Sequence, residues 1–157
     1  MDEEVKNRLR RWKEKAKGVE IDHWVRFIIH WMIFDACLAE LSKKDFDKDR
    51  LDWFYNNPTD LKEYFRKFWG TPKYVAVLGY LKDKSPIKDL RPSKRNNREN
   101  DVYLKDTTNE KEVFDFIYQI RCNTFHGGKN LADGDDNQLT RLSEQLLDEP
   151  LERFLNS

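Results

Sequence analysis

The sequence predicts an all-α protein, a helical bundle with one long basic loop. Several segments lack Gly and Pro and repeat apolar residues at spacings of three and four, which is typical of amphipathic helices. Aromatic residues make up 13% of the chain, enough to build a core although 37% of the residues are charged. A chain of 157 residues has the usual size of one domain. We therefore expect a single domain over residues 1–157.

Two helices are predicted in the first quarter of the chain. Residues 2–17 are rich in helix formers and end at Gly18, and their apolar stripe consists of Val5, Leu9, Trp12 and Ala16. Apolar residues of segment 20–42 cover most of the helix circumference, so this segment should be a central helix packed on several sides. Its charged residues make a membrane span costly. We interpret it as a buried core helix.

Shorter elements follow. Residues 47–55 and 60–69 have helical patterns and are separated by Asn-Asn-Pro-Thr, where Thr59 can cap the second helix. Segment 74–81 is apolar and partly β-branched, so a helix and a short strand are both compatible with it.

Residues 85–109 should form a long loop, because they contain Pro86, Pro92, an Asn pair and a cluster of basic side chains. Within residues 82–98 seven Lys and Arg oppose two Asp, giving a charge of +5 although the whole chain is neutral. Such a segment can contact phosphate groups, and it can equally be a solvated connector.

Two helices should close the chain. From residue 109 onward Val113, Phe116, Ile117 and Ile120 restore a helical pattern, which can end at the Gly127-Gly128 pair. A leucine-rich segment, 136–154, predicts the last helix, which Pro150 would bend or break.

Two widely separated cysteines, Cys37 and Cys122, form neither a disulfide framework nor a metal-ligand spacing. The first residues lack the apolar segment of a secretory signal. We therefore expect a cytoplasmic protein with no membrane partner. Cys122 itself is best interpreted as a small packing residue, since a nucleophile would need an adjacent base.

The strongest candidate for chemistry is the run Arg121-Cys-Asn-Thr-Phe-His126-Gly-Gly-Lys129. Arg121 carries a permanent charge whose planar fork suits phosphate oxygens. His126 can transfer a proton near neutral pH, since its unperturbed pKa is about 6.5. The two glycines leave space for a ligand, and Lys129 could anchor a phosphate.

This run resembles the signature of the HEPN superfamily, an all-helical group whose motif is Arg, four to six residues, then His. The gap here is four residues. The segment Trp31-Met-Ile-Phe-Asp35-Ala36 also resembles a pattern in an early helix of some members. Cys122 stands where members often have a polar residue, and Asn123 comes one position later.

The resemblance implies a metal-independent endoribonuclease that needs no cofactor and works as a homodimer with a shared cleft. Arg121 and His126 would be catalytic, and Asn123 and Lys129 would bind the RNA substrate. Such an enzyme could serve as a toxin or defence effector restrained by an antitoxin or regulatory protein. The alternative is a non-catalytic module of the same fold that binds RNA or nucleotide, or only mediates dimerisation.

Other polar and aromatic residues have structural interpretations. His30 and Arg26 could border the same cleft, but satisfied core or surface groups fit their spacing better. Asp35 lies in an apolar stretch and therefore needs a hydrogen-bond partner, with a catalytic role and a role in orienting the motif helix both open. The five tryptophans are expected in the core rather than as base-stacking platforms: Trp12, Trp24, Trp31, Trp53 and Trp69.

Overall fold

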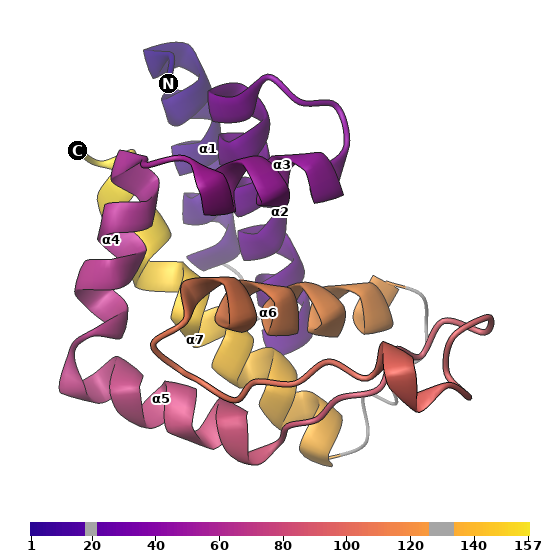
Figure 1. The fold of residues 1–157 in the computed structure, drawn as a ribbon. Helices are drawn as coiled ribbons and strands as arrows, with labels where there is room; N and C mark the ends of the chain where they lie inside the picture. The colour runs from indigo at the N-terminus through magenta and orange to yellow at the C-terminus, as the bar shows by residue number, and fades with distance from the viewer. Residues whose placement is uncertain (18–21, 126–133) are drawn as a thin grey trace.

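The computed structural model describes residues 1–17, 22–125 and 134–157, and within them it is all-helical (Figure 1). The described residues form seven α-helices and no β-strand, which confirms the predicted all-α fold class for them. The helices are α1 Glu3–Lys17, α2 His23–Ser42, α3 Asp47–Asn56, α4 Asp60–Trp69, α5 Pro72–Asp83, α6 Glu110–Phe125 and α7 Gly134–Leu155.

The short middle helices begin where local chemistry favours a helix start. The Thr59 hydroxyl accepts a hydrogen bond from the Lys62 N–H, which confirms the predicted cap of α4. Segment 74–81, compatible with helix or strand, lies inside α5. Pro72 occupies its first turn, where a missing N–H costs nothing and the fixed φ suits a helix.

An aromatic cluster at Phe34 joins α2 to three other helices. The Phe34 ring stacks on Phe114 of α6 at 5.1 Å and meets the edges of Phe54 and Phe65 at 5.6 Å each. All four side chains are fully buried. Edge-to-face and offset-stacked rings add to the free energy gained by burying apolar surface. This cluster fixes α6 against the centre of the bundle.

Helix α7 is the central packing element of the bundle and contacts α1, α2, α4, α5 and α6 (Figure 1). It runs past Pro150 as one helix, so the predicted break does not occur. A proline at this position cannot donate to the Leu146 carbonyl one turn earlier. The indole N–H of Trp69 donates to that carbonyl instead, at 3.0 Å inside the core. Trp69 thus supplies the missing donor.

Residues 84–109, here called the strap, connect α5 to α6 and run beside α6 (Figure 1). The predicted loop is confirmed, with one short 3₁₀ turn at Arg98–Asn100 and one antiparallel bridge between Ile87 and Val102. Near the end of the strap, the backbone N–H groups of Lys105 and Asp106 donate to the Glu112 carboxylate of α6, both at 2.9 Å. The strap is therefore tied to α6.

The prediction that all five tryptophans lie in the core was partly wrong. Trp31 and Trp69 are buried, whereas Trp12 is 39% exposed. The inward stripe of α1 consists of Leu9, Lys13 and Ala16, because the Lys13 ammonium is buried against Asp148 of α7. Trp12 lies beside that stripe rather than on it. Among the described helices, none is long and apolar enough to span a membrane.

Candidate functional site

Arg121 lies near the C-terminal end of α6, where its guanidinium is held between two aromatic rings. The group lies 4.7 Å from the Phe125 ring centroid and 5.7 Å from that of Tyr118. Its side chain is 24% exposed, and its Nε atom is buried without a hydrogen-bond partner in the described part of the chain. A partly desolvated guanidinium can bind an anion strongly.

Asp47, at the start of α3, faces this arginine. Its Oδ2 atom lies 3.4 Å from Nη1 of Arg121 and accepts the Tyr118 hydroxyl at 3.2 Å. Burial, then the Cys122 thiol and the Asp47 carboxylate, raise the pKa of Tyr118, so its hydroxyl stays a neutral donor. At 3.4 Å, Asp47 only partly neutralises the guanidinium. Sequence reasoning missed this residue, because it lies far from Arg121 along the chain.

Asp35 positions the start of α3. Its carboxylate accepts from Arg50 at 2.7 Å, and Arg50 also donates to the backbone carbonyls of Lys44 and Asp45. The expected hydrogen-bond partner is therefore present, but it orders the turn between α2 and α3 rather than the motif helix. Because α3 begins at Asp47, this contact indirectly places the carboxylate that faces Arg121.

Asn123 is 3% exposed and fastens the strap to α6. Its Oδ1 atom accepts the Leu90 N–H at 3.0 Å and the Gln119 Nε2–H at 2.9 Å, and its Nδ2 atom donates to the Lys88 carbonyl at 2.8 Å. These bonds use most of the capacity of the amide. The structure thus places Asn123 in an anchoring position, and substrate binding by this side chain stays a prediction.

The two other predicted site residues, His126 and Lys129, lie outside the described residues. Of the predicted set, the structure describes only Arg121 and Asn123. They are two positions apart on α6 and have different surroundings: Arg121 is partly exposed and Asn123 is buried. Cys122 between them is 3% exposed, which agrees with its interpretation as a packing residue.

A groove lies beside Arg121, enclosed by α3, the strap and α6. It has a volume of about 490 Å³ and is lined by three tyrosines together with basic and acidic side chains. Tyr118 belongs both to this groove and to the aromatic pair that holds Arg121. We call this cavity the tyrosine groove. Its tyrosines are Tyr55, Tyr103 and Tyr118.

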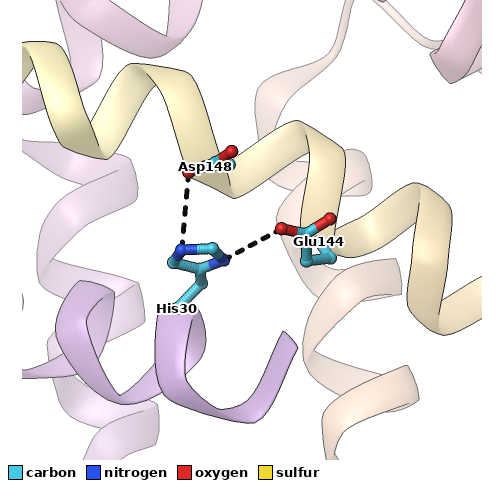
Figure 2. Close-up of side chains that lie close together, drawn as sticks. All are labelled: His30, Glu144 and Asp148. Atoms are coloured by element: carbon cyan, nitrogen blue, oxygen red, sulfur yellow. Dashed lines mark ion pairs between the residues drawn. The ribbon is translucent and has the colours of Figure 1, made fainter. Parts of the chain in front are cut away.

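A second group of ionisable side chains lies between α2 and α7, with His30 and Glu144 buried and Asp148 partly exposed. Figure 2 shows His30 of α2 between Glu144 and Asp148 of α7. Nδ1 of His30 lies 3.4 Å from Glu144 and Nε2 lies 3.5 Å from Asp148, and the histidine is 3% exposed. Lys13 of α1 donates to the same Asp148. His30 thus belongs to an ion-pair cluster that joins α1, α2 and α7.

The ligand types of this cluster suit a metal ion, but its geometry does not favour one. Each carboxylate faces a different ring nitrogen, whereas an ion binds one nitrogen and gathers the other ligands around it (Figure 2). The Lys13 ammonium already supplies a cation to Asp148. Burial alone would raise the pKa of Asp148, but the hydrogen bond from Lys13 and nearby positive charge keep it lowered. We interpret the cluster as structural.

Comparisons with protein-family models, with curated proteins and with solved structures found no match to this chain. The HEPN resemblance therefore rests on the Arg121-to-Lys129 run and on the early-helix pattern.

Proposed function

We propose that this chain is a metal-independent endoribonuclease of the HEPN type, with Arg121 and His126 as its catalytic residues. The observation that carries the proposal is the environment of Arg121. Its guanidinium is partly desolvated, held by two rings and only loosely paired with Asp47. His126 directly follows Phe125, the last residue of α6. The all-helical bundle is compatible with this superfamily.

The reaction needs a proton transfer and stabilisation of negative charge. The ribose 2′-oxygen attacks the adjacent phosphorus and loses its proton, the bond from phosphorus to the 5′-oxygen breaks, and that oxygen gains a proton. His126 would act as the base or the acid. Arg121 would donate to the non-bridging oxygens as their charge increases in the transition state. The products are a 2′,3′-cyclic phosphate and a 5′-hydroxyl.

The proposal includes a two-fold symmetric homodimer. One Arg and one His form a small catalytic set, and two copies that share a cleft would double it. Large apolar side chains are exposed near Arg121: Phe125 is 51% exposed, and Phe46, which precedes Asp47, is 71% exposed. Exposed apolar side chains mark an interaction surface where they form one contiguous patch. Light scattering should give about twice the chain mass, whereas an active monomer would rule out a shared cleft.

A second candidate is a non-catalytic module that binds RNA or nucleotide at the same place. The contact between Asp47 and Arg121 favours it, since a carboxylate next to the guanidinium weakens its effect on a phosphate. Under this alternative the protein binds RNA and leaves it intact. Cytoplasmic location and control by an antitoxin or regulatory partner belong to the first proposal.

In the deciding experiment, wild type, Arg121→Ala and His126→Ala are each incubated with single-stranded and structured RNAs in excess EDTA. Wild type should cleave and leave a cyclic phosphate, and His126→Ala should lose roughly 10²–10⁴-fold in rate. Arg8→Ala, which removes an exposed arginine of α1, is the control for the missing charge and should stay active. Full activity in His126→Ala, or loss of cleavage on chelation, would refute the mechanism. Binding without cleavage would favour the module.

A further inference from the structure

The geometry points to the tyrosine groove as a binding site for unpaired nucleotides of single-stranded RNA, with Tyr103 as its exposed stacking platform. This inference rests on the proposed function, because it names the substrate form and the path by which RNA reaches Arg121. It adds a site beyond the Arg-His motif. None of the residues that build it belongs to that motif.

Three different elements build the walls, which makes the groove a feature of the tertiary structure. Tyr55 comes from α3, Tyr103 from the strap and Tyr118 from α6. The walls are held in place: Asp115 of α6 accepts the Tyr55 hydroxyl at 2.7 Å, and the strap is fastened to α6 through Asn123 and Glu112. A volume of about 490 Å³ is within the usual range for small-ligand sites.

Each of the three rings has a cation close to its face. Lys111 lies 5.1 Å from the Tyr55 ring and Lys105 lies 5.3 Å from the Tyr103 ring. The Arg121 guanidinium lies 5.7 Å from the centroid of the Tyr118 ring. An alternation of aromatic rings and cations suits single-stranded nucleic acid, whose bases stack on rings while its phosphates meet positive charge.

Charge in the groove also suits a polynucleotide. Lys48 and Lys94 line it, and Lys94 belongs to the basic stretch of the strap. Of the acidic residues in the walls, Asp115 is bound to Lys111 at 2.5 Å and to Tyr55. Asp52 and Asp101 also line the groove, and a carboxylate can accept a hydrogen bond from the amino group of a base.

The groove favours single strands over duplexes. Bases of a duplex are stacked within the helix, so their faces cannot reach Tyr103 without unpairing. Tyr103 is 48% exposed, which leaves ring surface for an incoming base. Tyr118 continues the groove to the guanidinium of Arg121. An RNA strand in the groove would therefore pass from Tyr103 toward the proposed catalytic arginine.

The test measures binding separately from cleavage. A fluorescent 2′-O-methyl oligoribonucleotide has no free 2′-hydroxyl and cannot be cut by the proposed reaction, so anisotropy reports binding alone. Tyr103→Ala should weaken binding by roughly 5- to 150-fold, the usual range when one base no longer stacks on an aromatic ring. Tyr103→Phe keeps the ring and should bind like wild type. Lys94→Gln should also weaken binding.

Tyr80→Ala is the matched control, since Tyr80 is a 63% exposed tyrosine on α5 that lines a different cavity. It should bind like wild type, and a duplex of the same sequence should bind less tightly than the single strand. Wild-type affinity in Tyr103→Ala, or no binding by wild type, would overturn the groove proposal. Cleavage of ordinary RNA with no Tyr103 effect would leave the nuclease proposal standing alone. Tyr103-dependent binding without cleavage would support the groove and refute the nuclease.

Discussion

The carboxylate of Asp47 lies 3.4 Å from the guanidinium of Arg121 and at the same time accepts the Tyr118 hydroxyl. One acidic side chain thus places both the arginine and the tyrosine that joins it to the groove. The contact is weak enough to be exchanged, because a partly exposed ion pair typically contributes only about 0–1 kcal/mol. A phosphate could therefore displace Asp47 from Arg121.

Asp47→Asn should strengthen RNA binding. The amide can still accept the Tyr118 hydroxyl, but it removes the negative charge that competes with phosphate for Arg121. Affinity for a single-stranded 2′-O-methyl RNA should rise by up to about fivefold, as measured by anisotropy at low salt. Asp49→Asn removes a charge from the same first turn of α3 and serves as the control. Equal gains in both variants would mean that only the overall charge matters.

Asn123→Ala should release the strap. It removes three hydrogen bonds and leaves the Leu90 N–H and the Lys88 carbonyl without this partner, at a cost of about 1–3 kcal/mol for each group that stays buried and unpaired. Thermal unfolding should shift downward, and hydrogen exchange should accelerate in residues 84–109.

Asn56→Ala is the control for Asn123, since the Asn56 side chain donates only within its own helix. Wild-type stability and strap exchange in Asn123→Ala, combined with a loss of RNA binding, would instead support direct contact between Asn123 and the substrate.

The basic part of the strap should contribute to affinity rather than to the chemical step. Arg95 and Arg98 are exposed, and Lys94 lines the tyrosine groove. Changing all three to Gln should weaken binding and flatten its salt dependence, by about 0.7 in the log–log slope for each phosphate of the single strand that is no longer neutralised. The single-turnover cleavage rate at saturating protein should not change.

The matched triple replacement of Arg8, Arg11 and Lys15 removes three exposed charges from α1. If that variant loses affinity and the strap variant does not, α1 is the basic surface that meets RNA.

Trp69→Phe should destabilise the protein through one missing N–H. The Leu146 carbonyl would lose its indole donor, and Pro150 cannot replace it, so unfolding should require about 1–3 kcal/mol less. Pro150→Ala restores a backbone donor for that carbonyl. In a double-mutant cycle measured by urea unfolding, Trp69→Phe should therefore cost less when Pro150→Ala is present. Strict additivity of the two changes would argue against this partnership.

Local signals in the sequence predicted most of the fold. The apolar spacing of residues 2–17 and 20–42, the Thr59 cap and the composition of residues 85–109 are each set within a few neighbouring residues. The local expectation for Trp12 was wrong, and the last helix does not break at Pro150. In both cases a side chain from another helix decides the outcome: Asp148 draws Lys13 inward, and Trp69 supplies a donor to Leu146.

The candidate site likewise has some features that local sequence predicts and others that only the tertiary structure shows. The sequence by itself determined the helical class, the order of the helices and the presence of Arg121 in a motif helix, because these depend on short-range periodicity and residue chemistry. Only the tertiary structure brought Asp47 to Arg121, Asn123 to the strap, and Tyr55 and Tyr103 to one groove with Tyr118. These partners lie 15 to 74 positions apart, and no local pattern specifies them, because such contacts form only when the helices pack on their common core.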